Sequence, residues 1–360
     1  MRALRPSAIL APDWGFGAPP DAAAVEPPGA TSGDRVALVT YLEAIRQAMW
    51  EEMERDPRVF LMGEDVGEYG GAFKVTEGFL EHFGGERVLD TPIAESGIVG
   101  VACGAALVGQ RPIAEMQFID FIANAFDQLV NFVAKNYWRW GVPMPMVVRG
   151  PAGGGVRGGP YHSQNPEAFF FHVPGLKIVQ PATAYDAKGL LKAAIRDPNP
   201  VIYLEHKFLY RRIKEDLPDG DWIVPLGEAT IRRPGRDVSI VTYGAMVHKS
   251  LEAAAELERD GVDAEVIDLR TLAPLDTATV LDSVRRTSKL VIVHEDMRTG
   301  GIGAEIAAQV GEVAYEHLDG PIRRVAAKDA GGIPFAGPLE DAFLPQTADI
   351  VRACRELAAY

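Results

Sequence analysis

A glutamate at the start of a predicted helix is the first residue that could do chemistry. Residues 91–97 read TPIAESG, so Pro92 ends an extended segment and Glu95 opens a helix made largely of glycine and alanine. An acidic residue in a first helical turn is ordinarily stabilised by the helix dipole. If Glu95 instead faces an apolar cleft, its pKa rises and it could exchange a proton with a cofactor nitrogen near neutral pH. The spacing leaves both interpretations open.

A second pair of carboxylates follows a predicted strand at residues 59–62. The segment 63–67 reads GEDVG and carries Glu64 and Asp65. Open α/β sheets place their ligand crevices at the ends of such strands. The pair is either a polar turn, a proton relay or part of a cation site, and the pattern does not choose among them.

A glycine-rich segment, residues 153–159 (GGGVRGG), leads directly to His162. It lacks the order of a phosphate-binding P-loop or of a dinucleotide fingerprint. Its composition favours a mobile lid, because glycine lowers the cost of alternative backbone states. His162 would then be either a general acid or base delivered by the loop, or a structural histidine.

Composition and charge exclude several other functions. The 360 residues include 36 basic and 50 acidic side chains, a net charge of −14, which disfavours nucleic acid and anionic membrane surfaces as partners. There are two cysteines, and the seven histidines show no metal-binding spacing. No apolar run reaches the ~20 residues of a membrane span. These features indicate a soluble, cytoplasmic protein.

Alternating strands and helices must position these residues. A capping box at residues 40–43 (TYLE) predicts a helix that Pro57 stops. Short apolar runs predict buried strands, and longer periodic segments predict helices, which together indicate mainly parallel sheets. The expected strands of the first domain are 59–62, 112–118, 144–148, 176–179 and 201–204, and its further helices are 95–108, 119–137 and 185–195.

The polar segment 207–225 breaks the alternation and predicts a linker. We therefore expect a flexible tail at 1–34, an α/β domain at 35–206 and a second α/β domain at 226–360. The tail is too rich in proline and acidic residues for a targeting peptide. The second domain should contain strands at 238–243, 264–269, 290–294 and 322–326, and helices at 247–259, 277–285, 304–316 and 348–358.

From about residue 35 onward the chain resembles the beta subunits of thiamine diphosphate-dependent 2-oxo acid dehydrogenases, the decarboxylating components of the pyruvate, branched-chain and acetoin complexes. Ordered segments carry the resemblance: 56–65 (DPRVFLMGED), 90–95 (DTPIAE), 111–115 (RPIAE), 126–128 (FDQ), 161–164 (YHSQ), 186–189 (DAKG), 268–271 (DLRT) and 343–345 (FLP). It implies a pyrimidine-binding domain followed by a transketolase C-terminal-type domain.

The resemblance also assigns roles to residues. It makes Glu95 the acid that hydrogen-bonds the aminopyrimidine nitrogen of thiamine diphosphate and so promotes loss of the thiazolium proton. It makes Phe121 the ring stacked on the pyrimidine and Ile93 a neighbour in the cofactor pocket. Glu64 would belong to a buried acidic chain linking two active sites, and His162 would serve turnover and acyl transfer to the lipoyl thiol. Asn124 lies in the same pocket, where relatives often carry Gln or Pro.

A structural potassium site and several partners follow from the same resemblance. The potassium ligands would be carbonyls near Met146, Ala194 and Ile195, together with Asp197 and Asn199. The chain lacks the Gly-Asp-Gly pattern, followed by Asn, that holds magnesium and diphosphate in this superfamily. An alpha subunit would supply it in a heterotetramer of two alpha and two beta chains, and a lipoyl acyltransferase would dock on the C-terminal domain.

Two alternative functions belong to different classes. A non-catalytic α/β scaffold subunit would leave its partner's turnover unchanged in a Glu95→Gln variant. A transketolase-like carboligase assembled from split chains would transfer ketol units and ignore lipoyl acceptors. The preferred 2-oxo acid is not determined by the sequence, because much of the pocket belongs to the partner chain.

Overall fold

The computed structural model describes residues 38–360, so the tail predicted at residues 1–34 lies outside the described residues. Its first helix, α1 (Tyr41–Arg55), begins at the predicted capping box, in which Thr40 and Glu43 bond each other's backbone N–H groups. The helix ends at Asp56, immediately before Pro57, because proline disfavours a helical conformation in the residue that precedes it. The sequence therefore predicted both ends of α1 correctly.

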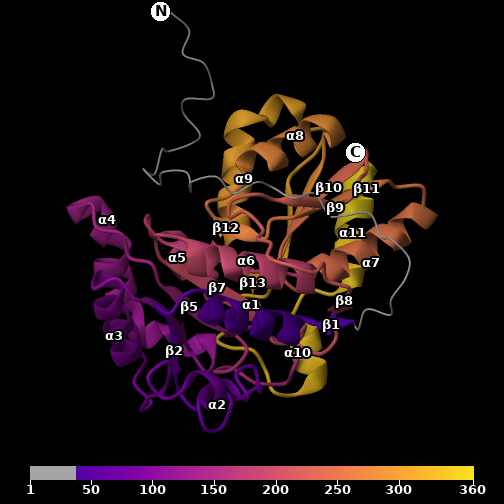
Figure 1. Ribbon diagram of the computed structural model, residues 1–360. Helices are drawn as coiled ribbons and strands as arrows, with labels where there is room; N and C mark the ends of the chain where they lie inside the picture. Colours follow the sequence, from indigo (N-terminus) through magenta and orange to yellow (C-terminus); the bar gives the residue numbers. More distant parts are fainter. Residues whose placement is uncertain (1–37) are drawn as a thin grey trace, which may run out of the picture.

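A seven-stranded sheet forms the centre of the first domain (Figure 1), in the order β12-β6-β7-β5-β4-β2-β3. Its strands are β2 (Val59–Gly63), β3 (Val88–Asp90), β4 (Arg111–Glu115), β5 (Val147–Ala152), β6 (Lys177–Val179), β7 (Val201–His206) and β12 (Thr271–Ala273). All neighbouring pairs are parallel except β12 with β6. This confirms the predicted mainly parallel sheet.

Helices cover both faces of this sheet. Val59 and Leu61 of β2 pack with α1 and α6 (Ala184–Arg196), whereas Phe60 and Met62 pack with α3 (Glu95–Leu107). Successive side chains of a strand point to opposite faces, so an unbroken apolar strand requires helices on both sides. The apolar runs that predicted strands thus also dictated the three-layer arrangement.

The second domain has a five-stranded sheet in the order β14-β13-β10-β11-β9. Its strands are β9 (Thr230–Arg233), β10 (Val238–Thr242), β11 (Ala264–Asp268), β13 (Leu290–Met297) and β14 (Arg323–Ala327), and only β9 is antiparallel. The surrounding helices are α7 (Met246–Arg259), α8 (Thr277–Thr287), α9 (Ile302–Val313), η4 (Tyr315–His317), α10 (Gly337–Phe343) and α11 (Thr347–Ala358). The fold is thus the predicted pair of α/β domains.

The single helix predicted at residues 119–137 is wrong. Three differently wound segments take its place: the 3-10 helix η2 (Ile119–Ala125), the π-helical η3 (Gln128–Val133) and α4 (Ala134–Trp140). Local winding of these kinds often marks functional sites. Short elements that periodicity did not predict are β1 (Val39–Thr40), α2 (Phe79–Phe83), α5 (Glu167–Phe171) and β8 (Lys214–Glu215), together with β3, β9, β12, α10 and η4.

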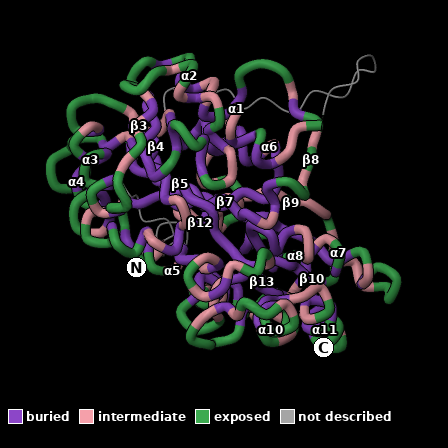
Figure 2. Tube along the Cα trace, turned by 90° about the horizontal axis from the view of Figure 1, so that it is seen from below, coloured by how far each residue is buried: buried purple, intermediate pink, exposed green. Residues whose placement is uncertain are grey.

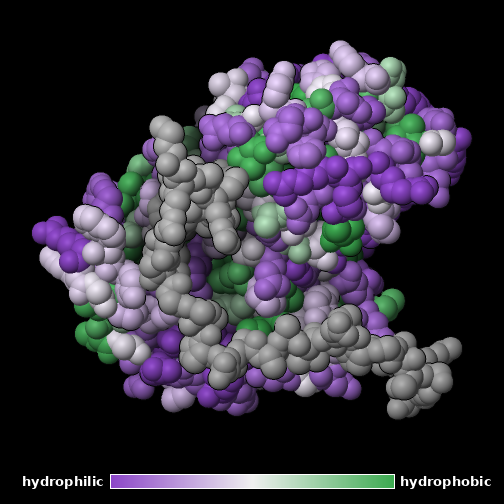
Figure 3. All heavy atoms as spheres, turned by 90° about the horizontal axis from the view of Figure 1, so that it is seen from above, coloured by the Kyte–Doolittle hydropathy of each residue, from purple (hydrophilic) through white to green (hydrophobic). Residues whose placement is uncertain are grey.

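The two domains are joined by more than the connecting segment. Strand β12 follows β11 in the chain yet pairs with β6 of the first sheet. Asp186 of α6 is buried and forms ion pairs with Arg232 and Arg270 of the second half. Buried residues run continuously through the middle of the molecule in Figure 2, and hydrophilic residues predominate on the face shown in Figure 3. The domains are therefore joined by a strand pairing, by buried ion pairs and by apolar clusters that contain residues of both.

Candidate active site

The surroundings of Glu95 distinguish between the two interpretations of its sequence position, a solvated acid of the first helical turn or a buried acid. It is the first residue of α3 and lies at the side of the seven-stranded sheet where the parallel strands end, which we call the carboxyl edge; the side where they begin is the amino edge. Its exposed fraction is only 7%. Its Oε2 atom accepts a hydrogen bond of 3.1 Å from Nδ2 of Asn124. The side chain is thus a buried carboxylate held from one side, rather than a solvated residue of a first helical turn.

Glu64 follows β2 at the same edge and is also buried. Its Oε1 atom has no hydrogen-bond partner within residues 38–360. Burial raises the pKa of Glu64, and the nearby carboxylates of Glu95, Asp65 and Glu115 raise it further. A raised pKa beside other acids makes a carboxyl group easier to protonate, which is a property of groups that relay protons.

Deeper in the sheet, buried acids are neutralised. Arg149, with an exposed fraction of 1%, forms ion pairs with Glu115 on one side and Glu205 on the other. Tyr210 also donates a hydrogen bond of 2.6 Å to Glu205. This network was not predicted from the sequence. By contrast, Glu64, Asp65 and Glu95 at the carboxyl edge form no ion pair with the described side chains; Asp65 and Glu95 each accept an amide hydrogen bond instead.

The 3-10 segment η2 connects Glu95 to His162. Residues three apart lie one above the other in a 3-10 helix, so Phe121 and Asn124 share one side of η2. Asn124 contacts Glu95, while the Phe121 ring lies edge-on to His162 at 5.7 Å between centroids. Phe118 lies closer to the same imidazole, at 4.5 Å. The structure thus brings Glu64, Glu95, Phe121, Asn124 and His162 into one region.

Ile93 is placed differently from its neighbours. It precedes Glu95 by two residues, and 83% of its surface is exposed. Figure 2 shows further exposed surface along the outer faces of α3 and α4. Large exposed apolar residues of α3, η3 and α4 and of the residue that follows α3 include Val101, Leu107, Val108, Phe132, Trp138 and Trp140. So many large apolar side chains exposed on neighbouring segments favour an interaction face.

The loop carrying His162 is held at both ends, in contrast to the mobile lid that its composition favoured. The N–H of Gly153 donates to the carbonyl oxygen of Gln164, which closes the loop. Asp120 accepts hydrogen bonds of 3.1 and 3.0 Å from the N–H groups of Ser163 and Gln164. Sequence reasoning missed Asp120, although its position directly before Phe121 was a signal that could have found it.

The residues predicted to bind potassium lie at the opposite, amino edge of the sheet. Arg111 donates to the carbonyl oxygens of Ile195 (2.7 Å) and Asp197 (3.2 Å), and Lys177 pairs with the Asp197 carboxylate at 2.5 Å. The carbonyls of Met146 and Ala194 accept backbone hydrogen bonds. The buried Oδ1 atom of Asn199 finds no hydrogen-bond partner in the described part of the chain.

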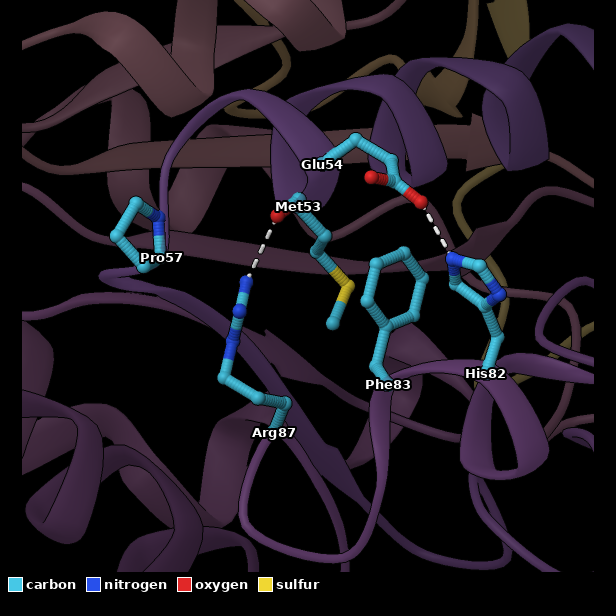
Figure 4. A pocket seen from close by; sticks show the side chains of 6 residues that line it. All are labelled: Met53, Glu54, Pro57, His82, Phe83 and Arg87. Atoms are coloured by element: carbon cyan, nitrogen blue, oxygen red, sulfur yellow. Dashed lines mark hydrogen bonds and ion pairs between the residues drawn. The ribbon is translucent and has the colours of Figure 1, made fainter.

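A surface depression of about 330 Å³ also lies at the amino edge, beside the starts of β2 and β3. Figure 4 shows its lining: Met53, Glu54, Pro57, His82, Phe83 and Arg87. Arg87 donates to the carbonyls of Val59 and Met53, and His82 pairs with Glu54. Because ligands of open α/β sheets bind at the carboxyl ends of strands, this depression is not the candidate site.

Comparisons with known proteins identify the class of fold. The family model of the transketolase pyrimidine-binding domain matches residues 38–212, and that of the transketolase C-terminal domain matches residues 227–350. A solved structure described as a split-gene transketolase, inactive beta4 tetramer, matches with a TM-score of 0.71 over 89% of this chain and 98% of that chain. At 24% identity this last likeness concerns the fold alone. Fold and site together define a two-domain protein of the transketolase type.

Curated relatives identify the family. The 2-oxoisovalerate dehydrogenase subunit beta of Bacillus subtilis (strain 168) is 50% identical over 90% of this chain and 100% of that protein. The pyruvate dehydrogenase E1 component subunit beta of Rickettsia felis is 48% identical over 89% and 99%, respectively. Its namesake from Staphylococcus aureus (strain COL) is 45% identical over the same shares. The chain belongs to the family of 2-oxo acid dehydrogenase E1 beta subunits, and is a subunit of an oxidoreductase.

The pyrimidine-binding domain implies thiamine diphosphate as the cofactor, and the residues at the carboxyl edge fit one end of it. These residues are a buried carboxylate, Glu95, an aromatic ring, Phe121, on the same segment as the Asn124 that bonds Glu95, and the exposed Ile93 two residues before Glu95. Within residues 38–360 there is no cluster of three or more acidic, histidine or cysteine side chains that could hold a metal ion. The same residues contain no helix long and apolar enough to cross a membrane.

Proposed function

We propose that this chain supplies the pyrimidine-binding half of an active site that oxidatively decarboxylates a 2-oxo acid and passes the acyl group to a lipoyl domain. One observation carries the proposal: Glu95 is buried at the start of α3, held by Asn124, and adjacent to the exposed Ile93. Relatives at 45–50% identity are subunits of 2-oxoisovalerate and pyruvate dehydrogenases, which supports pyruvate or 2-oxoisovalerate as the substrate.

In this site the Glu95 carboxyl group would hydrogen-bond the ring nitrogen of the pyrimidine. The Asn124 amide fixes the carboxyl group, so that its remaining oxygen is directed at the ring. Phe121 supplies the stacking surface, and Ile93 covers the pyrimidine edge. When bound, thiamine diphosphate supplies the carbon nucleophile that attacks the 2-oxo group. Glu64, whose pKa is raised by burial and by neighbouring acids, would move protons to and from Glu95 as part of a buried acidic chain.

His162 acts on the substrate side of the site. Its imidazole is half-buried against Phe118 and Phe121, which positions it beside the cofactor ring that Phe121 stacks upon. A histidine there can hold a proton for turnover and for acyl transfer to the lipoyl thiol. Neighbouring apolar rings exclude water from this exchange.

An alpha subunit completes the site. The exposed apolar residues of α3 and α4, which include Trp138 at 88% exposure, lie on the element that begins with Glu95 and on a neighbouring one. Burying this face against the alpha subunit would cover Ile93 and bring in the groups that bind magnesium and diphosphate. We infer a heterotetramer of two alpha and two beta chains, with a lipoyl acyltransferase docked on the acidic C-terminal domain.

Two further assignments concern the ion and the compartment. We propose that potassium binds at the amino edge, where the unpartnered amide oxygen of Asn199 lies near the carbonyls of Met146, Ala194 and Ile195, and Asp197. Amide and carbonyl oxygens suit hard cations. Both cysteines, Cys103 and Cys354, are buried and unpaired, which supports a reducing compartment such as the cytoplasm.

The decisive experiment uses the enzyme assembled with its alpha subunit and supplied with a lipoyl domain. We expect turnover of pyruvate or branched 2-oxo acids, and a loss of about 10²- to 10⁴-fold in kcat for Glu95→Gln, the usual contribution of a general acid. A scaffold subunit would show unchanged turnover in that variant. Ketol transfer without use of the lipoyl acceptor would instead identify a transketolase-like carboligase.

A further inference from the structure

The loop that carries His162 belongs to the first domain, but carboxylates of the second domain hold it. Residues 153–165 leave the end of β5 and return to α5, and they contact Glu295 of β13 and Glu340 of α10. Both glutamates are buried, and Glu340 has an exposed fraction of 0%. Neither is part of the carboxyl-edge site, so their burial calls for another explanation.

Glu295 connects the two ends of the loop. Its Oε1 atom accepts hydrogen bonds from the N–H of Gly154 (2.5 Å) and from Nδ2 of Asn165 (3.1 Å). Burial alone would raise the pKa of Glu295, but His206 and the hydrogen bonds from the loop lower it to about 2. The carboxylate therefore remains ionised and accepts charge-assisted hydrogen bonds. Lys207 adds a bond from its Nζ to the carbonyl oxygen of Gly153.

Glu340 holds the middle of the loop. Its Oε1 atom accepts from the N–H groups of Gly155 (2.9 Å) and Arg157 (3.3 Å), while Oε2 pairs with the Arg157 guanidinium at 2.5 Å. Gly155 has a φ of +78°, a backbone conformation that only glycine adopts readily. A glycine-rich segment has many alternative conformations, so these external acceptors select one of them.

The far end of the loop is fixed within the first domain. Asp120 accepts the N–H groups of Ser163 and Gln164, and it directly precedes Phe121, whose ring contacts His162. His162 thus lies between an anchor next to the cofactor-stacking ring and anchors in the second domain. Loss of the second-domain anchors would leave residues 154–157 without the acceptors that fix their backbone, while the contacts of Gly153 and Gln164 remain.

We propose that Glu340 and Glu295 are positioning residues, through which the C-terminal domain holds the His162 loop in the conformation needed for turnover. The proposal rests on the catalytic role proposed for His162. In this proposal Glu340 contacts neither the substrate nor the cofactor. What matters at residue 340 is an acceptor oxygen at the correct reach, because Oε1 accepts from two backbone N–H groups of the loop, while Oε2 pairs with the Arg157 side chain.

Two conservative variants, studied in the assembled enzyme, distinguish the effect of the length of the residue 340 side chain from the effect of its charge. Glu340→Gln keeps an acceptor oxygen at the same distance and loses the charge, whereas Glu340→Asp keeps the charge and loses the reach. Glu340→Ala removes both. Asp341→Ala is the matched control, because Asp341 is exposed and pairs with the same Arg157 guanidinium at 3.0 and 3.1 Å without contacting the loop backbone.

Hydrogen exchange measured by mass spectrometry over peptides covering residues 153–165 reports loop order independently of activity. We expect faster exchange in Glu340→Asp and Glu340→Ala, and exchange close to that of the unchanged protein in Glu340→Gln and Asp341→Ala. Turnover should follow the same ranking, with kcat about tenfold lower in the Asp variant because a displaced catalytic group loses its alignment. Half-saturation by thiamine diphosphate should stay unchanged, since Glu95 and Phe121 are not touched.

Several results would overturn the proposal. Unchanged exchange in Glu340→Asp would show that Glu340 does not order the loop. Faster exchange with unchanged kcat would show that the order of the loop does not matter for turnover. A loss in the Gln variant as large as that in the Asp variant would refute the claim that an acceptor oxygen at the correct reach is sufficient at residue 340. The Gln and Asp variants decide the question even if Glu340→Ala does not fold, and a His162→Ala enzyme with full activity would refute the proposed role of His162 separately.

Discussion

Carboxylates at the two edges of the seven-stranded sheet have opposite electrostatic environments. At the amino edge Asp56 is paired with Arg58, and the hydrogen bond from that guanidinium is the main cause that lowers the pKa of Asp56 to about 2. At the carboxyl edge Glu64 is buried beside other acids, and its pKa is raised. At the amino edge the paired charge of Asp56 therefore contributes to stability. At the carboxyl edge Glu64 lies unfavourably beside other acids, and such an arrangement suits proton transfer.

The same contrast holds for exposed apolar surface. Next to Glu95 the chain exposes Ile93, and α4 exposes Trp138, whereas the guanidinium groups of the amino edge are directed at backbone carbonyls. The carboxyl edge exposes large apolar side chains, whereas the charged groups of the amino edge are mostly paired within the chain. This difference is what one expects when a cofactor and a second subunit bind at one edge only.

The largest effect that would sharpen this comparison concerns Glu64. In Glu64→Gln of the assembled enzyme we expect kcat to fall about tenfold, because the amide cannot relay a proton. The free energy of unfolding should increase by about 0.5 to 1 kcal/mol, since removing one of several adjacent acids relieves repulsion. Steady-state kinetics and calorimetry measure the two parts. A Glu64→Gln variant with a lower free energy of unfolding would refute the claim that Glu64 is unfavourably placed at the carboxyl edge.

Asp56→Asn provides the converse change at the amino edge. We expect a loss of about 1 kcal/mol in the free energy of unfolding at neutral pH with no change in kcat, because a charge-assisted hydrogen bond is weakened far from the site. A carboxyl whose pKa is lowered on folding contributes stability above its unfolded value of about 4, and this stability is lost as the pH falls toward 2. Melting curves at several pH values should therefore show the variant and the unchanged protein converging in acid.

The smallest effect concerns potassium. Replacing sodium chloride by potassium chloride should raise the melting temperature by about 1 to 3 °C through selective binding to the folded state. The difference should disappear in Asn199→Ala, which removes the unpartnered amide oxygen. Equal melting temperatures in both salts would mean that Arg111 and Lys177 alone neutralise this edge.

Local signals in the chain predicted most of the architecture. The capping box at Thr40 and the proline at residue 57 set the ends of α1, and apolar runs located the longer strands of both sheets. The helix expected at residues 119–137 failed, because its apolar spacing fits several windings, and tertiary contacts of Asp120 and Asn124 accompany a 3-10 segment there. Strand β12 has only three residues, too few for a periodic pattern, and exists because it pairs with β6.

By itself, the sequence determined the alternation of strands and helices, the acidic charge and the residue types at positions 64, 95, 121 and 162. Those properties depend on composition and short-range spacing. The tertiary structure decided that Glu95 is buried, that Glu64 lies among acids without a cation, and that Glu295 and Glu340 reach across to the His162 loop. A pKa and a hydrogen-bond partner are set by which side chains lie within a few ångströms, and residues as far apart as 154 and 295 meet only after the two domains have packed together.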